Sequence, residues 1–153
     1  MNFLVLALIF PLFVGVRSYS RGAPIVACQT FSPWHVWIAF DESAAELTAT
    51  KLGSTVNVTL SSDKPFKGFI VQGRDLNDEV IGHFMHDAYG NFKELNCGGI
   101  TDSTITHKDD KSKYEVIAMW RIPKEVTKKT VNFKAVVVYQ YRNGQKVNFE
   151  LKL

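Results

Sequence analysis

Apolar residues recur at every second position in this chain, and this period of two constrains the fold more than any other feature. In residues 55–60, Val56, Val58 and Leu60 alternate with polar residues. Because successive side chains of a β-strand point to opposite faces, the alternation predicts a strand with one buried face and one solvent-facing face. Asn57 is expected on the solvent-facing side.

A later stretch shows the same alternation. In residues 114–122 every second residue is apolar, and the row ends before Pro123, which cannot donate a hydrogen bond to a neighbouring strand. We expect the following side chains of this row to face the core: Tyr114, Val116, Ala118, Trp120 and Ile122.

The C-terminus is expected to form a hairpin. Residues 131–141 have the composition of a third long strand, and Asn143-Gly144 suits a type I′ turn because both central residues of such a turn need a positive φ. Beyond this turn every second residue is again apolar, which predicts the returning strand. Its inward side chains are Val147, Phe149 and Leu151.

These strands favour an all-β fold. No segment has a helical stripe, and short strands separated by Gly, Pro, Asn and Asp turns predict an immunoglobulin-like sandwich of two antiparallel sheets. The chain is 46% hydrophobic and 12% aromatic, which is too apolar for a disordered protein. A formal net charge of +3 is too small to indicate a nucleic-acid partner.

The first residues predict export. Residues 4–16 form an almost unbroken apolar run that is followed by Arg17-Ser18, and this pattern is typical of a signal peptide cleaved after Ser18. The run is shorter than the roughly 20 residues that a membrane-spanning helix needs. We therefore expect a signal peptide at residues 1–18 and one secreted, extracellular domain at residues 19–153, without a membrane span.

The two cysteines and one sequon fit an exported domain. In an oxidising compartment, Cys28 and Cys97 predict a single disulfide, the alternative being two buried thiols. Such a bridge would close a loop of about 70 residues and stabilise the fold by about 4 kcal/mol. Asn57-Val58-Thr59 is a glycosylation sequon whose asparagine lies on the predicted solvent-facing side.

Residues 66–74 form an apolar, β-favouring run with two glycines, Gly68 and Gly73, where side chains would normally pack. Together with other short segments, this run resembles the reeler domain family, and most of all the small insect defence proteins built from one such domain (noduler-like). The other segments, in chain order, are Gly22-Ala23-Pro24, Ala27-Cys28, Pro33 and His35, Val56 to Leu60, Cys97, Thr104 to His107, Trp120 to Pro123, and Val131 to Val138.

The resemblance implies an immunoglobulin-like sandwich, a Cys28–Cys97 bridge, and neither catalytic residues nor a cofactor. It also implies a secreted innate-immunity protein, antimicrobial in character, that binds microbial lipopolysaccharide or glucan and promotes aggregation of host blood cells. The alternative is an extracellular adhesion or signalling module that binds a host protein or a matrix polymer. We expect a monomer in either case. Gly73 stands where the family usually has alanine, and this difference is expected to loosen the strand.

The predicted ligand-binding residues are Trp34, His35 and Trp37. Aromatic faces stack on sugars or lipid tails, and a ring nitrogen can form hydrogen bonds beside them. The favoured alternative is that Trp34 belongs to the buried face of a strand, from which Trp37 points away. The lysines at 108, 111, 113, 124, 128 and 129 indicate solvated loops rather than an anion-binding rim.

The sequence does not predict an enzyme or a metal site. His83, His86 and Asp87 are the cluster that most resembles a set of metal ligands, but their spacing on non-helical backbone favours a polar turn instead. His107 is expected to be a hydrogen-bonded residue of the sandwich, because no nucleophile with a recognisable flanking motif accompanies it.

Overall fold

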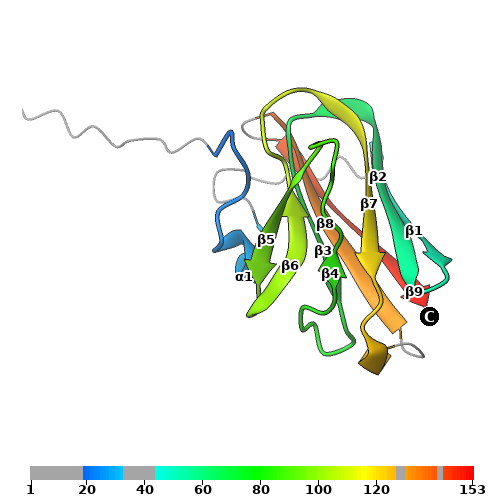
Figure 1. Ribbon diagram of the computed structural model, residues 1–153. Helices are drawn as coiled ribbons and strands as arrows, with labels where there is room; N and C mark the ends of the chain where they lie inside the picture. Colours follow the sequence, from blue (N-terminus) through cyan, green and yellow to red (C-terminus); the bar gives the residue numbers. More distant parts are fainter. Residues whose placement is uncertain (1–18, 33–43, 127–129, 141–142) are drawn as a thin grey trace, which may run out of the picture.

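The computed structural model describes residues 19–32, 44–126, 130–140 and 143–153 (Figure 1). These residues form two antiparallel sheets packed face to face, which confirms the predicted all-β sandwich. The four-stranded sheet has the order β1 (Ala45–Leu52), β2 (Thr55–Phe66), β7 (Lys113–Arg121), β4 (His83–Phe84). The five-stranded sheet has the order β5 (Lys93–Cys97), β6 (Ile100–Thr106), β3 (Gly68–Arg74), β8 (Thr130–Gln140), β9 (Asn143–Lys152).

Helical structure is limited to two short segments in the described residues, α1 (Ala27–Thr30) and the 3-10 turn η1 (Lys124–Val126). Neither is long and apolar enough to cross a membrane.

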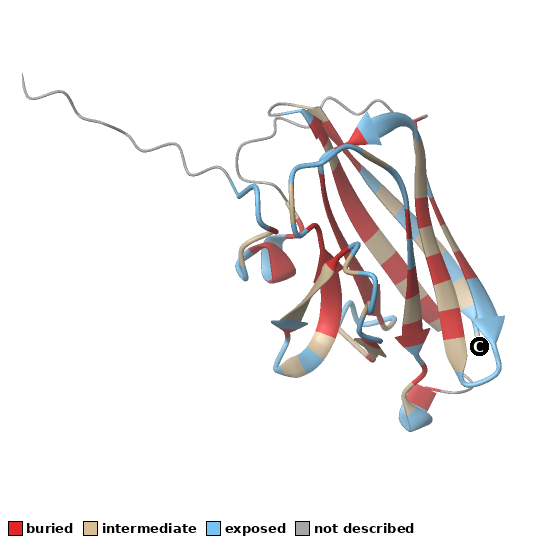
Figure 2. Ribbon diagram, turned by 45° about the horizontal axis from the view of Figure 1, so that its top comes forward, coloured by how far each residue is buried: buried red, intermediate tan, exposed pale blue. Residues whose placement is uncertain are grey.

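The alternation seen in the sequence places the core between the sheets. In β2, Val56, Val58 and Leu60 are almost completely buried, as predicted. Buried residues alternate with less buried ones along the long strands (Figure 2). The three inward residues of β9 are partly buried against the same core, also as predicted, and they are Val147, Phe149 and Leu151.

Along β7 and the residue that follows it, the predicted inward row is correct except at its first residue. Val116, Ala118, Trp120 and Ile122 are buried, whereas Tyr114 is 59% exposed. The pairing of β2 with β7 shifts register between Ser61 and Phe66, and Tyr114 lies opposite this irregular stretch. Because the regular ladder is broken there, the alternation no longer decides which way the side chain points.

The C-terminal hairpin is present, but the predicted turn is wrong. Gln140 pairs with Asn143, and Gly144 pairs with Val138, so both residues of the Asn-Gly dipeptide belong to β9. The ladder therefore continues beyond this dipeptide, and the connection falls on residues 141–142, outside the described residues.

The two glycines of the 66–74 run are each covered by a ring, one from His107, directly after β6, and one from Trp120 in β7 of the opposite sheet. A Cβ atom on Gly68 would lie 3.3 Å from Cε1 of His107, and one on Gly73 would lie 3.1 Å from the indole of Trp120. The expected loosening of β3 at Gly73 stays a prediction. The missing side chain of Gly73 provides the space that the completely buried Trp120 fills.

A glutamine side chain connects the two sheets along the side where β9 and β1 meet. Gln145 of β9 is buried, its Oε1 accepts a hydrogen bond from the backbone N–H of Ala45 at 2.9 Å, and its Nε2 donates to the carbonyl of the same residue at 3.3 Å. Tyr139 donates its hydroxyl proton to the same Oε1 at 2.9 Å. This side chain joins β9 of one sheet to β1 of the other, and the two strands lie side by side in Figure 1.

Candidate functional site

The N-terminal segment, residues 19–32, packs on the outer face of the five-stranded sheet (Figure 1). Ala27 and Phe31 form a small second core with Ile70 of β3 and Val136 of β8. Cys28 is bonded to Cys97 at the end of β5, so the predicted disulfide is present and fastens this segment to the sheet.

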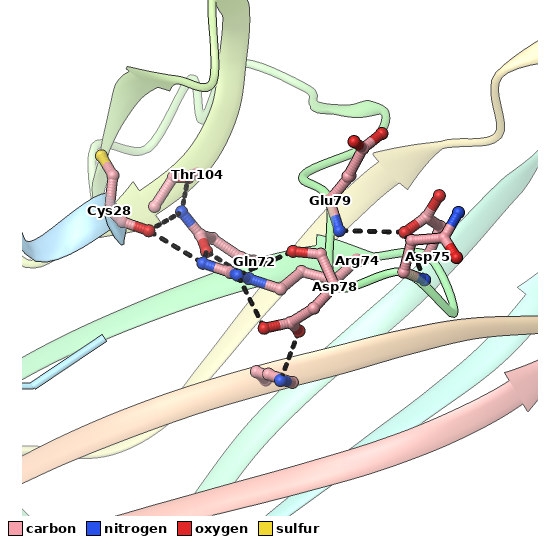
Figure 3. Close-up of polar contacts among 9 residues, drawn as sticks. Cys28, Gln72, Arg74, Asp75, Asp78, Glu79 and Thr104 are labelled. Carbon is pink, nitrogen blue, oxygen red and sulfur yellow. Dashed lines mark hydrogen bonds and ion pairs between the residues drawn. The ribbon is translucent and has the colours of Figure 1, made fainter. Parts of the chain in front are cut away.

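A buried polar cluster fixes the same segment (Figure 3). Nη2 of Arg74 donates hydrogen bonds to the carbonyl of Cys28 at 2.8 Å and to Oε1 of Gln72 at 2.7 Å. Nε2 of Gln72 donates to Oγ1 of Thr104 at 2.8 Å. The guanidinium carbon of Arg74 also lies 5.4 Å from the ring centroid of Phe31, within range of a cation–π contact.

The charge of this arginine is neutralised by the loop that follows β3. Nη1 of Arg74 donates to the carbonyl and to Oδ2 of Asp78, and Lys134 donates to the other carboxylate oxygen. The hydrogen bond from Lys134, together with the positive charge of Arg74, holds the pKa of Asp78 below its usual value of 3.8. With its charge already paired, Arg74 acts as a framework residue and not as an anion-binding group.

Sequence reasoning missed this cluster, although a signal for it was present. Gln72 and Arg74 are two residues apart in an otherwise apolar run, so they lie on one face of β3. Buried polar side chains at that spacing need partners on the element that covers the strand.

Beside the cluster, a pocket of about 240 Å³ opens between the N-terminal segment and the sheet. Its floor is apolar and belongs to β3 and β8, and its wall belongs to the N-terminal segment. The floor residues are Gly68, Ile70, Val136 and Val138, and the wall residues include Tyr19, Ala23, Pro24 and Ala27. Lys67, His107 and Asp110 are among the polar side chains that line the pocket.

His107 connects the wall of the pocket to its floor. Its Nδ1 accepts a hydrogen bond from the backbone N–H of Phe69 at 3.2 Å, and its Nε2 lies 2.9 Å from the carbonyl oxygen of Tyr19. A neutral imidazole protonated on Nε2 satisfies both contacts. His107 is buried and hydrogen-bonded within the sandwich, as predicted.

The pocket can accommodate an apolar group, and its lining includes one cationic side chain, Lys67, and one anionic side chain, Asp110. Cavities of about 150 Å³ lined by aliphatic side chains can hold benzene, so about 240 Å³ leaves room for a ring or a short alkyl chain. Lys67 is exposed beside the pocket and has no ion pair with any described residue. An ammonium group at that position can neutralise a ligand's negative charge.

The three predicted ligand-binding residues, Trp34, His35 and Trp37, lie outside the described residues. The sequon residue Asn57 lies on the outer face of β2, in the sheet opposite the one that forms the floor of the pocket.

His83, His86 and Asp87 have separate partners and do not form a set of metal ligands. His83 pairs with Arg121 in β4, whereas His86 is exposed and its Nδ1 lies 3.1 Å from Oε1 of Glu94. Asp87 accepts backbone hydrogen bonds within its own loop, and although partial burial opposes ionisation, these N–H groups lower its pKa. No group of three or more potential metal ligands was found within the described part of the chain.

The loop lysines are exposed or paired. Lys108 and Lys111 are exposed, whereas Nζ of Lys113 lies 2.8 Å from Oδ1 of Asp109. This hydrogen bond lowers the pKa of Asp109. Residues 128–129 lie outside the described residues.

The comparisons with known proteins agree with this architecture. The chain is 32% identical over 151 residues to Defense protein l(2)34Fc of Drosophila melanogaster, and the match covers 89% of this chain and 88% of that protein. It is 28% identical over 134 residues to human Ferric-chelate reductase 1, but it spans only 22% of that protein's length. The crystal structure of the human F-spondin reeler domain superposes with a TM-score of 0.63 at 19% identity, covering 78% of this chain and 95% of that one.

The family model of the reeler domain matches residues 26–143. This range includes both cysteines of the disulfide, the eight strands β1 to β8, and the floor of the pocket. The chain therefore belongs to the reeler domain family.

Proposed function

We propose that this protein is a secreted defence protein that recognises microbial surfaces by binding the lipid part of lipopolysaccharide. A relative named as a defence protein matches nearly from end to end, whereas the ferric-chelate reductase shares about a fifth of its length with the chain. The reductase activity of that relative is therefore not transferred to this chain.

The observation that carries the proposal is the apolar pocket beside Lys67, which has no ion pair with any described residue. Lipopolysaccharide combines alkyl chains with phosphate groups, so one chain end can enter the pocket while a phosphate meets the ammonium group. A neutral glucan has neither an alkyl chain nor an anionic group and would gain nothing from this site. The pocket thus favours lipopolysaccharide over glucan as the ligand.

The test is a pull-down of the oxidised protein, residues 19–153, on Gram-negative bacteria, glucan particles and host blood cells at physiological salt. Binding to the bacteria that soluble lipopolysaccharide competes away, and that soluble glucan does not, is the expected result. Binding to host cells alone would contradict the proposal and would assign the protein to the adhesion or signalling class.

Two variants and one control locate the site. Lys67→Glu should weaken binding to lipopolysaccharide about tenfold, because it replaces an attraction by a repulsion at the same position. Lys51→Glu makes the same charge change at an exposed position on the other sheet and is expected to bind like wild type. Val138→Phe should reduce binding without a charge change, since the larger side chain fills the pocket. If Lys67→Glu and Lys51→Glu weakened lipopolysaccharide binding equally, the binding would depend on the net charge of the protein and not on this site.

Aggregation of blood cells around coated bacteria is the expected downstream effect. It is measured by counting aggregates with wild-type protein and with Lys67→Glu in the same preparation of cells.

A further inference from the structure

The outer face of the four-stranded sheet carries an apolar patch, which we define as Met85, Ile117 and Met119. Ile117 is 52% exposed and Met85 is 39% exposed. The backbone N–H of Met85 donates to the carbonyl of Met119 at 2.8 Å, so these two side chains belong to adjacent strands. Since Trp120 and Phe84 fill the core from the opposite face, the patch points outwards.

The two key residues of the sequon lie directly beside this patch. Asn57 pairs with Met119, and Thr59 pairs with Ile117, in the ladder between β2 and β7. Directly opposite residues of an antiparallel pair have Cβ atoms about 5 Å apart on the same face. A sugar attached to Asn57 would therefore emerge next to Met119, with Ile117 and Met85 as the next apolar neighbours.

The side-chain amide of Asn57 makes no hydrogen bond with a described residue. Its Oδ1 is buried without a hydrogen-bond partner, and the residue as a whole is partly exposed. An N-linked glycan is attached to the nitrogen of this amide, Nδ2. Asn57 therefore offers this nitrogen from the outer face of β2, one of the two inner strands of the sheet.

We propose that Asn57 carries an N-linked glycan whose first sugars cover the Met85–Ile117–Met119 patch. The proposal rests on the secretion proposed above, because the donor is an oligosaccharide linked to a lipid pyrophosphate in the secretory pathway. In the transfer, a bond forms between Nδ2 and the anomeric carbon, the bond from that carbon to the pyrophosphate oxygen breaks, and Nδ2 loses one proton as the lipid pyrophosphate leaves.

The covered patch has two consequences. A sheet face that carries a glycan is closed to flat protein partners, which leaves the other sheet, with its pocket, as the accessible recognition face. Removing the glycan would expose contiguous apolar surface, and such surface promotes self-association.

The first measurement is the intact mass of the protein secreted from insect cells, before and after treatment with peptide-N-glycosidase F. Loss of one N-glycan mass, with conversion of Asn57 to aspartate, is expected. Secreted protein without a glycan would overturn this inference and leave the proposed lipopolysaccharide binding intact.

The second measurement tests whether the glycan covers the patch. The folded, secreted protein is deglycosylated enzymatically, so that folding in the cell does not affect the result, and binding of an anilinonaphthalene dye and the oligomeric state are compared before and after. Dye fluorescence should rise several-fold and oligomers should form. An unchanged monomer with unchanged fluorescence would overturn the covering role.

Matched variants complete the test. Thr59→Ala abolishes the sequon, whereas Thr59→Ser changes the same side chain and keeps it. Only Thr59→Ala should reproduce the deglycosylated behaviour. Adding Ile117→Thr to Thr59→Ala should restore the monomer, because it removes the most exposed apolar side chain of the patch. Oligomers that persist in this double variant would show that another surface is responsible.

Discussion

At the scale of single residues, glycines decide where the buried tryptophan can lie. Gly82 has a φ of +67°, and a Cβ atom there would lie 2.2 Å from Cζ2 of Trp120. Gly73 approaches the same indole from β3. The ring is thus enclosed by backbone on two sides and packs edge-on against Phe133, with 5.2 Å between the ring centroids. No larger side chain fits at Gly82 unless the core rearranges.

Gly82→Ala should therefore lower the free energy of unfolding by about 2–5 kcal/mol, the combined cost of left-handed backbone and of overpacking against Trp120. Gly53→Ala is the matched control, because Gly53 also has a positive φ, +62°, but no atom lies within 4 Å of the added Cβ. The free energy of unfolding of Gly53→Ala should fall by only about 1–2 kcal/mol, the cost of the left-handed backbone alone. The measurement is urea unfolding of both variants, and equal losses would contradict a steric role for Trp120.

At the scale of elements, the side chain of Gln145 joins two edge strands that share no regular ladder. It supplies both a donor and an acceptor to the backbone of Ala45, and Tyr139 orients it. A buried amide with these partners satisfies backbone groups that would otherwise lack them where β1 and β9 meet.

Gln145→Leu should destabilise the protein by about 1–3 kcal/mol, because it leaves the N–H and carbonyl of Ala45 without their partner. Gln140→Leu, at an exposed position of β8, should change stability by less than about 0.5 kcal/mol. Thermal melting of the two variants makes the comparison. Similar melting temperatures would mean that water replaces the glutamine at no cost.

The N-terminal segment depends on a second long-range connection, the disulfide between Cys28 and Cys97, which are 69 residues apart. The hydrogen bond from Arg74 to the carbonyl of Cys28 and the small core around Phe31 hold the same segment against the sheet. This segment also forms one wall of the pocket, so the bond supports both stability and the site.

Replacing both cysteines with serine should lower the free energy of unfolding by about 4 kcal/mol through the greater freedom of the unfolded chain. It should also weaken lipopolysaccharide binding, because the pocket wall is no longer fastened to the sheet. Wild type treated with a thiol reductant is the matched comparison and should melt like the double variant. A double variant that melts like oxidised wild type would contradict this role of the bond.

At the scale of the whole molecule, ionised carboxylates hold several loops in place. Asp78, Asp87 and Asp109 each have a lowered pKa. A group whose pKa is lower in the folded protein than in the unfolded chain contributes stability above the unfolded pKa and loses it as the pH falls through the folded pKa. The protein as a whole should therefore lose stability below about pH 4.

Asp78→Asn tests this expectation, because it removes the carboxylate that binds both Lys134 and Arg74. Its melting temperature should lie below that of wild type at pH 7, and the difference should shrink steadily towards pH 2. Asp63→Asn is the control, since the Asp63 side chain has no hydrogen bond or ion pair with the described residues. A difference between wild type and Asp78→Asn that is constant with pH would contradict the assignment.

The sequence by itself determined the class of fold. The alternation of Val56, Val58 and Leu60, and of the row that ends at Ile122, marks which face of each strand is buried, because strand periodicity is a local property. The disulfide was predicted from two cysteines and a predicted export signal, and it is present in the structure. Such features need no knowledge of which strands become neighbours.

Only the tertiary structure decided the register and the site. The exposure of Tyr114 and the place of Asn143 within β9 depend on pairing between strands, which alternation does not specify. The pocket, the Arg74 cluster and the position of Asn57 beside Met119 join residues far apart in the sequence. Trp34, His35 and Trp37 lie outside the described residues and remain predictions. A local pattern fixes which side of a strand is buried, and only the folded chain fixes which neighbour lies against it.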